Sequence, residues 1–450
     1  MKREGSLGAP TRHPLDWENP DFLNKESLDQ EMERQFDVCH GCRRCFNLCG
    51  SFPKLFDLVD DSATGELDSV SVDSYASVVD DCTLCDMCFL TKCPYVPPHE
   101  FNIDFPHLML RYKAHQFATK EVPFIKEQLA EVDRNAAVLS AVAPITNALN
   151  KEGSITRPIL EKIANIDKRA SIPKFAGTTL IRQLARNPIR INENGPAFGQ
   201  KVVLYATCYG NYNETQIGLL ATKILAHLGV DICVEYPGCC GMPQLELGNI
   251  PRVAKGGENI AAFFAPFIDE GYTIISLVPS CSLMMKSEWP LMQPDNKDIQ
   301  KLKTNTKDIS EYIVSIANTV GLTEGLKALG EDVTLQLACH ARAQNIGTKA
   351  AEMLRLIPNM NVHVIERCSG HGGTWGMMVD NFDLALKIGT PAVRQIAQKA
   401  NPIFSSECPL AAEHLRQGIE KAKKPGESTP EFQKMHPIEI FARAYGLNVG

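Results

Sequence analysis

Two short runs hold eight of the sixteen cysteines in this 450-residue sequence. The first, residues 39–49, is CHGCRRCFNLC, and the second, residues 82–94, is CTLCDMCFLTKCP. Each run has three cysteines at C-x2-C-x2-C spacing and a fourth a few residues later. Cysteines at this spacing fold a tight loop around one iron–sulfur cube, because soft thiolates suit such clusters. The two runs therefore predict two [4Fe–4S] clusters.

The fourth cysteine of each run defines how the ligands divide between the clusters. It is expected on the outgoing helix, where it binds the other cluster of the pair. We therefore expect the first cluster on Cys39, Cys42, Cys45 and Cys93. The second is expected on Cys82, Cys85, Cys88 and Cys49.

The two runs depart slightly from the simplest pattern. Cys49 is followed by Gly-Ser-Phe before Pro53, and four residues rather than three precede Cys93. Zinc is the alternative for any C-x2-C pair. A zinc site needs four ligands in two pairs, so it leaves the third cysteine of each triplet unexplained. The pattern favours iron–sulfur clusters.

The overall composition bounds the class of protein. Hydrophobic residues make up 44% and charged residues 22%, as in an ordinary folded protein, and the net charge of −7 argues against a nucleic-acid partner. The first twenty residues lack the apolar segment of a signal peptide, and no stretch reaches the ~18–20 apolar residues of a membrane span. We expect a cytoplasmic protein, with peripheral attachment to the inner face of the membrane left open. In a reducing compartment, cysteines indicate metal ligands or redox groups.

A second set of cysteines follows predicted β-strands after residue 200. The strands are expected at residues 201–207, 230–236 and 272–278, with helices at 216–228 and 254–268 between them. They lead to Cys208, to Cys239 and Cys240, and to Cys281. Alternating strands and helices predict a parallel α/β unit. The carboxyl ends of parallel strands share the edge where ligands bind, so these thiols are expected to converge.

The same order recurs further along the chain. Strands expected at residues 333–338, 361–366 and 402–405 lead to Cys339, Cys368 and Cys408. The repeat indicates a structural duplication. The alternative is a set of independent buried core cysteines, which does not explain their shared position at strand ends. Cys233 lies in mid-strand and is expected to be an inert core thiol.

Several phrases in this region resemble those of a known family. They are Cys208-Tyr-Gly-Asn-Tyr-Asn, Cys239-Cys240-Gly241-Met-Pro, Ser280-Cys281 and Cys339-His340. From about Phe36 onward the chain is similar to the CCG (cysteine-rich) domain family. That family includes the iron–sulfur subunits of anaerobic glycerol-3-phosphate dehydrogenase and of lactate and glycolate oxidases, and heterodisulfide reductase.

The resemblance implies a third iron–sulfur cluster and a specific electron path. The third cluster is implied on Cys208, Cys239, Cys240 and Cys281. The second repeat is depleted, because Ser369 follows Cys368 where the family pairs cysteines and Ala411 stands where a C-x-x-C would end. Cys339, Cys368 and Cys408 remain there, with His340 and His371 as additional candidate ligands. These residues could hold a cluster in which one iron lacks a protein ligand, or they could hold no cluster, and the sequence does not decide between the two.

The expected architecture is α plus α/β. It comprises an N-terminal arm (1–35), a helical two-cluster ferredoxin-type domain (36–115), a helical linker (116–199) and two tandem parallel α/β CCG units (200–320 and 321–450). The glycine-rich segment 370–376 fails the G-x-G-x-x-G spacing, and close backbone approach to the Cys368 site explains its glycines equally well. No flavin or nucleotide is expected on this chain.

The implied function is electron relay from a flavoprotein dehydrogenase to a quinone or a redox protein. The rival is a reductase acting on a disulfide, thiol or peroxide at the incomplete second site, so the chain's status as an enzyme stays open. A redox or iron sensor is a third possibility, without a DNA-binding element to support it.

Two surface segments each allow two interpretations. The acidic insert 57–81 is expected to be solvated surface rather than a docking face, and the apolar linker stretch 136–149, interrupted by Pro144, is expected to pack against neighbouring domains rather than a membrane or partner.

Overall fold

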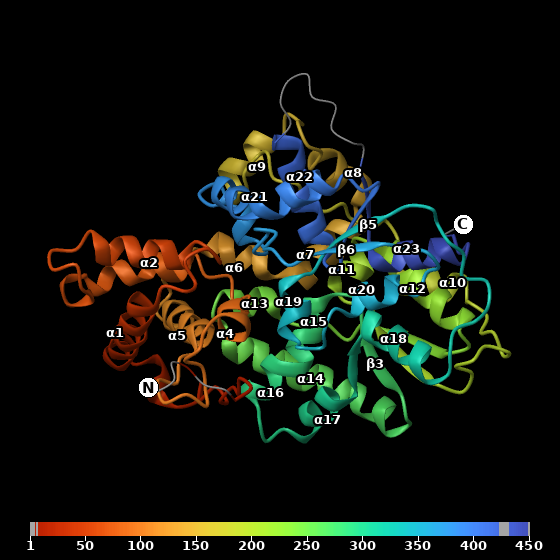
Figure 1. The fold of residues 1–450 in the computed structure, drawn as a ribbon, viewed down its shortest axis with the longest axis horizontal. Helices are drawn as coiled ribbons and strands as arrows, with labels where there is room; N and C mark the ends of the chain where they lie inside the picture. The colour runs from red at the N-terminus through yellow and green to blue at the C-terminus, as the bar shows by residue number, and fades with distance from the viewer. Residues whose placement is uncertain (1–4, 6–7, 423–431, 449–450) are drawn as a thin grey trace.

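The computed structural model describes residues 5, 8–422 and 432–448 (Figure 1). Its N-terminal part is helical, and two parallel four-stranded sheets with surrounding helices follow. The coarse prediction of a mixed helical and α/β protein is confirmed. Residues 1–4 and 6–7 of the expected N-terminal arm, and residues 423–431 and 449–450 of the expected second α/β unit, lie outside the described part.

The N-terminal helices pack around a small aromatic core. Phe36 contacts Tyr75 and Phe105 at ring-centroid distances of 5.0 and 5.9 Å. Phe52 contacts Phe105 at 4.6 Å. The elements are η1 (Pro20–Leu23), α1 (Lys25–Cys42), α2 (Ser51–Asp60), η2 (Leu67–Ser69), η3 (Val72–Ser74), α3 (Tyr75–Asp80), α4 (Met87–Thr91) and α5 (Phe105–Ala118).

Helix α1 carries the first two cysteines of the first run, which were expected in a loop. Its buried residues Leu28, Met32 and Phe36 recur every four residues, so the apolar stripe continues the helix up to Cys42. Arg43 then ends it in the left-handed conformation, with φ of 53°. The expected position of the fourth cysteines was also wrong, because Cys49 precedes α2 and Cys93 follows α4.

The linker forms five short helices. They are α6 (Phe124–Ala130), α7 (Val132–Ala141), α8 (Ala143–Leu149), α9 (Arg157–Ala164) and α10 (Leu180–Arg186). The predicted interruption near Pro144 is confirmed, since α7 ends at Ala141 and Pro144 lies in the first turn of α8. Proline suits that position because the first turn has no helical partner for its missing N–H.

The first sheet contains β1 (Lys201–Tyr205), β2 (Asp231–Glu235), β3 (Thr273–Ser276) and β4 (Thr306–Asp308), all parallel in the order β2-β1-β3-β4. Its first three strands match those expected from the sequence. Strand β4 was not predicted, because its three residues, Thr-Lys-Asp, lack an apolar pattern. The helices are α11 (Cys208–Tyr212), α12 (Thr215–His227), α13 (Met242–Glu246), α14 (Ile250–Asp269), α15 (Pro279–Leu283), the π-helical η4 (Met284–Glu288), α16 (Trp289–Met292), α17 (Lys297–Asn305) and α18 (Ile309–Thr319).

The second sheet repeats this order with β5 (Val333–Gln336), β6 (Val362–Ile365), β7 (Ile403–Ser406) and β8 (Gln433–Met435), arranged β6-β5-β7-β8. Its fourth strand, β8, was likewise not predicted. The helices are α19 (Cys339–Ala343), α20 (Lys349–Leu354), η5 (Trp375–Met377), α21 (Phe382–Lys399), α22 (Pro409–Ala422) and α23 (Pro437–Ala444). In both sheets the strand order reverses beside the first strand, which is where open parallel sheets bind ligands.

Alternating side chains of β1 separate two cores. Val203 and Tyr205 belong to a continuous core that also contains Phe36 and Phe52, so it joins the N-terminal helices to the first sheet. Val202 and Leu204 face a second core, which includes β5 residues and joins the two sheets. The carboxyl ends of the strands are thereby held close to the N-terminal helices, of which α4 and α5 lie beside α13 in Figure 1. Across the described residues, no helix combines the length and apolarity needed to span a bilayer.

Candidate functional site

The first thiol group comprises Cys39, Cys42, Cys45 and Cys93, which line one pocket together. Apolar side chains, among them Phe52 and Phe56, line the same pocket. Burial raises the pKa of Cys39 well above its ordinary value, and the neighbouring thiols raise it further. Ionising a thiol in such a half-buried apolar pocket is costly, and bound metal cations remove that cost.

The second thiol group comprises Cys49, Cys82, Cys85 and Cys88. Burial raises the pKa of Cys49 well above normal, and the charges of Cys85 and Cys82 add to it. Cys88 is affected in the same way and also lies near Cys45 of the first group. Each group thus combines the triplet of one run with the fourth cysteine of the other. The structure brings these thiols together in the predicted sets, and cluster binding by them stays a prediction.

Arg12, from the N-terminal arm, contacts the loop of the second thiol group. Its guanidinium donates to Asp86 at 2.9 and 2.8 Å and to Asp104 at 2.8 and 2.9 Å. It also lies 3.5 Å from Glu288 and stacks on Phe89 at 4.6 Å. Asp86 stands between Cys85 and Cys88 and has φ of 62°, so this ion pair fixes a strained loop residue. Sequence reasoning missed Arg12, because the polar arm around it carries no motif.

The third thiol group, Cys208, Cys239, Cys240 and Cys281, lies at the carboxyl edge of the first sheet. The sulfur atoms of Cys208 and Cys239 are 3.8 Å apart. Cys240 contacts both Cys239 and Cys281. The contact with Cys208 lowers the pKa of Cys239 well below normal, and the backbone N–H of Gly241 also donates to its sulfur. The structure brings these four thiols together, as the sequence predicted.

The linker contributes an unpredicted carboxylate to the third thiol group. Asp133 of α7 accepts hydrogen bonds from the Tyr236 hydroxyl and, at 2.7 Å, from the backbone N–H of Cys239. Burial raises the pKa of Asp133. No spacing in the sequence links residue 133 to residue 239, so only the tertiary fold could show this contact.

The three cysteines of the second sheet do not form one group. Cys339 contacts Cys368 and also Cys85 of the second thiol group. Cys408 instead accepts from the backbone N–H groups of Leu410 and Ala411 and lies near Cys281. We call Cys339 and Cys368 the thiol pair. The contact with Cys339 lowers the pKa of Cys368 to about 7, and the backbone N–H of Gly370 lies 3.3 Å from its sulfur.

The two candidate histidine ligands have other surroundings. His340 Nδ1 lies 2.8 Å from the hydroxyl of Ser280, so it bridges the ends of the two sheets. His371 Nε2 is buried without a hydrogen-bond partner among the described residues, and its ring faces His414 at 6.1 Å. Burial lowers the pKa of His371 to about 3, which keeps it neutral.

The glycine-rich segment 370–376 approaches Cys368 through the backbone N–H of Gly370, and it also approaches other elements closely. A Cβ atom on Gly370, whose φ is +78°, would lie 2.0 Å from the carbonyl oxygen of Ala385 in α21. One on Gly372 would lie 2.8 Å from Thr83, in the second cysteine run. Close backbone approach therefore does explain these glycines. The elements approached include α21 and the second cysteine run.

Cys233 differs from the expected inert core thiol. It is only half-buried, because β2 lies at the edge of its sheet, and its sulfur is 3.2 Å from a carboxylate oxygen of Glu235. It belongs to none of the three thiol groups.

Comparison with known proteins identifies part of the chain. Residues 202–286 match the Cysteine-rich domain family (CCG), and this span contains the whole third thiol group. Because of this similarity we call residues 202–286 the cysteine-rich domain. The chain is also homologous to a subunit of anaerobic glycerol-3-phosphate dehydrogenase from Escherichia coli K12, at 24% identity over 321 residues, 70% of this chain and 76% of the relative. Lactate utilization protein A of Bacillus velezensis is 26% identical over 187 residues, 39% of this chain and 75% of that protein.

The donor set suits iron–sulfur clusters in the cysteine-rich domain and in the N-terminal helices. Each of the three thiol groups supplies four sulfur ligands, and the walls of the first group are apolar. Among the described residues, no three Cys, His, Asp or Glu side chains converge on a point where one metal ion would sit. A cube spreads its four thiolates over separate iron corners, so its ligands need not meet at one point.

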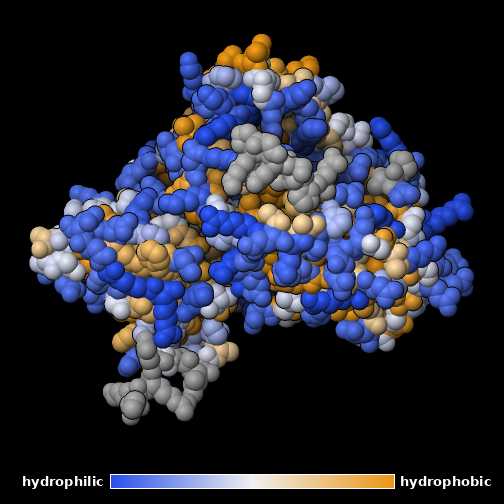
Figure 2. Space-filling view, turned by 45° about the horizontal axis from the view of Figure 1, so that its top comes forward, coloured by the Kyte–Doolittle hydropathy of each residue, from blue (hydrophilic) through white to orange (hydrophobic). Residues whose placement is uncertain are grey.

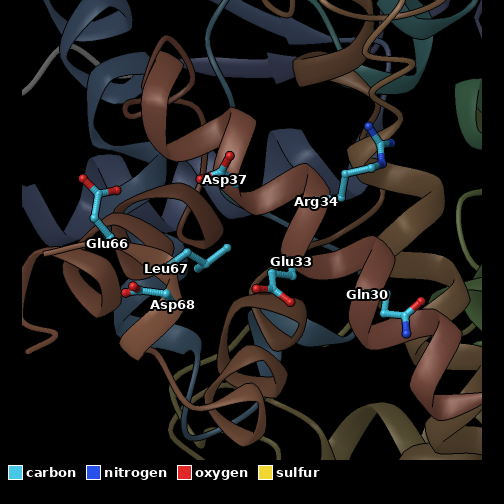
Figure 3. A pocket seen from close by; sticks show the side chains of 7 residues that line it. All are labelled: Gln30, Glu33, Arg34, Asp37, Glu66, Leu67 and Asp68. Atoms are coloured by element: carbon cyan, nitrogen blue, oxygen red, sulfur yellow. The ribbon is translucent and has the colours of Figure 1, made fainter. Parts of the chain in front are cut away.

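The acidic insert is folded but presents its carboxylates to solvent. Tyr75, Val78 and Val79 of the insert are buried, whereas most of its acidic side chains are exposed. Figure 3 shows Glu66 and Asp68 of the insert beside Glu33 and Asp37 of α1 around a shallow hollow. Asp81 is the buried exception, and Lys54 lies 2.9 Å from it. Solvated acidic side chains are what the sequence predicts.

The linker helices pack inward and leave an apolar outer face. Within the stretch 136–149, Ala136 and Ala143 are buried, but Val138 and Val142 are 61% and 45% exposed, so the expected packing against neighbouring domains is present only in part. On the outside of α8 and α9, Ile145, Ile159 and Ile163 are 63%, 58% and 71% exposed, with Ile155 and Leu149 beside them. Figure 2 shows apolar atoms gathered at the end of the molecule where these helices lie in Figure 1.

Glu407, next to Cys408, predicts a pH dependence of stability. Burial raises its pKa to about 8, and Glu407 Oε2 accepts from the backbone N–H of Ala338 at 3.1 Å. The folded chain therefore holds a proton that the unfolded chain loses near pH 4.5, so this contribution is complete below pH 4.5 and is lost as the pH rises through 8. Between pH 5 and 9 the free energy of unfolding of the wild type should fall because of this residue. In Glu407→Gln that fall should be smaller by on the order of 3 kcal/mol. Urea unfolding of both proteins at the two pH values measures it.

The exposed Glu420→Gln variant is the matched control, because this residue lies half-exposed in an ion pair with Arg416. If Glu407→Gln and the wild type keep parallel pH profiles, the Glu407 assignment is wrong.

Proposed function

We propose that this chain is an iron–sulfur electron-transfer subunit that relays electrons between a flavoprotein dehydrogenase and a quinone or redox-protein acceptor. The observation that carries the proposal is the series of neighbouring residues that links the three thiol groups. Cys45 of the first group neighbours Cys88 of the second. Cys85 of the second contacts Cys339, and His340 bonds to Ser280, beside Cys281 of the third.

In this proposal the first and second thiol groups hold one [4Fe–4S] cluster each, and the third thiol group holds a further iron–sulfur cluster. Such clusters would supply one-electron carriers at each position. The chain's own residues would hold the second and third clusters apart from water, since Cys82, Cys88, Cys240 and Cys281 are all buried. Hydrogen bonds to the sulfurs, such as that from Gly241, would adjust the potentials.

The finer domain plan belongs to the same proposal. Residues 36–115 act as a helical ferredoxin-type domain, residues 116–199 as a linker, and residues 200–320 and 321–450 as tandem cysteine-rich units. The support is the identical strand order of the two sheets and the position of Cys339 three residues after β5, matching Cys208 after β1. The N-terminal arm is tied to the first sheet by Arg12 and by the Trp17 indole, which donates to the carbonyl of Met292 at 2.8 Å.

A dehydrogenase partner is supported by the relatives, one of which belongs to anaerobic glycerol-3-phosphate dehydrogenase. We place the chain in the cytoplasm. The exposed isoleucines of α8 and α9, with Lys162 among them, make this face the candidate for peripheral contact with a membrane surface, because apolar side chains beside cations favour that interface.

The relay is tested by oxidation of reduced protein. Anaerobically purified chain would be reduced chemically and mixed rapidly with a short-chain quinone, or with a one-electron protein acceptor, while cluster absorbance and frozen-sample EPR are followed. The relay predicts reoxidation of every cluster through one acceptor, together with magnetic interaction between the first two clusters. Reduced clusters that neither acceptor reoxidises would contradict it.

A further inference from the structure

The thiol pair stands apart from the three four-thiol groups. Cys339 contacts Cys368, and the third cysteine of the second sheet, Cys408, lies near Cys281 instead. Two thiols do not complete the four-thiolate ligand set of a cube. Two thiols in contact are, however, the starting geometry for a disulfide, which needs only a small closing movement.

The surroundings of Cys368 favour its reaction as a thiolate. The backbone N–H of Gly370 points to its sulfur at 3.3 Å, and a hydrogen bond of this kind stabilises negative charge there. The thiols of Cys339 and Cys368 are both only partly buried. Gly370 is held in place by its contact with Ala385, so the donor is fixed.

The other neighbour of Cys339 is a predicted cluster ligand. The thiol of Cys339 contacts Cys85. The contacts around cluster sulfurs are one of the means by which a protein sets a reduction potential. A disulfide with Cys368 directs the Cys339 sulfur toward Cys368, so its contact with Cys85 changes.

We propose that Cys339 and Cys368 form a redox-active pair, which closes to an internal disulfide on reaction with a low-molecular-weight disulfide and so changes the contact of Cys339 with Cys85. The disulfide is inferred from the contact between the two thiols alone. Its effect on a cluster rests on the proposed function.

The exchange balances in two steps. The Cys368 thiolate attacks one sulfur of the external disulfide, whose S–S bond breaks and releases one thiolate. The Cys339 thiolate then attacks the Cys368 sulfur, forming the internal S–S bond and releasing the second thiolate. The protons lost by the two cysteines protonate the two leaving thiolates, so the pair is oxidised and the external disulfide is reduced. A low-molecular-weight thiol reverses both steps.

The first test detects the bond itself. Full-length, cluster-loaded protein would be equilibrated anaerobically in a series of reduced and oxidised glutathione mixtures, quenched in acid, alkylated and digested for mass spectrometry. We expect a peptide pair linked through Cys339 and Cys368 that grows with the oxidised fraction. Cys368→Ser and Cys339→Ser should lose it completely, and Cys233→Ser, outside every thiol group, should retain it.

Alkylation of both thiols in every mixture would overturn the proposal, as would linkage of either one to Cys85 or Cys408. Loss of iron in Cys368→Ser would also overturn it, because the pair would then be a ligand set.

The second test follows the cluster held by Cys85. Its reduction midpoint, measured by EPR-monitored titration, should shift between protein with the pair reduced and protein with the pair oxidised. Cys339→Ala, which cannot form the disulfide, should show no shift. A linked peptide without a midpoint shift would overturn the effect of the pair on the cluster. Preparations without iron would refute the proposed function but leave the peptide test able to decide the disulfide.

Discussion

Replacing Cys42 by serine should abolish electron transfer to either acceptor and remove about four iron atoms per chain, the content of one [4Fe–4S] cube. Cys42 lies in the last turn of α1, in the pocket shared with Cys39, Cys45 and Cys93. Serine has nearly the same size, so packing is kept while the soft thiolate ligand is lost. Iron analysis and the rapid-mixing assay measure the two effects.

Cys233→Ser is the matched control for this variant. It makes the same chemical change on β2, at a half-buried thiol that belongs to no group, and should leave iron content and transfer rates unchanged. Wild-type turnover by Cys42→Ser with a physiological donor would show that the relay does not pass through the first thiol group.

Replacing Arg12 by methionine should destabilise the protein by about 3–5 kcal/mol, the cost of leaving buried charges without a partner. Asp104 and Glu288 would then depend on His107, which lies 3.2 Å from Asp104 and 3.4 Å from Glu288, and Asp86 would lose its ion pair with Arg12. Methionine keeps most of the contact area over Phe89, so the change is mainly electrostatic. Urea unfolding under anaerobic conditions gives the free energy of unfolding.

Lys255→Met is the comparison, because Lys255 forms an exposed surface pair with Glu258 and should cost at most about 1 kcal/mol. Equal effects of the two substitutions would contradict the role given to Arg12. The loop that contains Asp86 joins Cys85 to Cys88, so Arg12→Met should also loosen the second thiol group and release its iron more readily to a chelator.

The sequence predicts those parts of the site that follow strict local rules. The spacing of each triplet, together with its distant fourth cysteine, was enough to divide eight thiols into the two sets that the structure brings together. Strand periodicity placed Cys208, Cys240 and Cys281 at one sheet edge, because parallel strands of one unit must end on the same side.

The rest depends on contacts between distant segments. Arg12 and Asp133 lie in stretches without a motif, and each acquires its partner only when the N-terminal arm or the linker folds onto the sheets. The strand repeat could not show that Cys408 lies apart from Cys339 and Cys368. The repeat predicts that each residue lies at the sheet edge, but it does not predict the direction of the side chain. The helical position of Cys42 was missed because the cysteine spacing alone predicted a loop, although the apolar stripe of α1 runs to Phe36.

The central claim is that the cysteines between residues 39 and 93 bind iron as two cubes. Protein purified without oxygen and analysed for iron and acid-labile sulfide tests it most directly. The account predicts brown protein with at least about eight irons per chain, and about twelve when the cysteine-rich domain is also loaded, at four per cube. Colourless protein that contains zinc, or no metal, at these cysteines would contradict it.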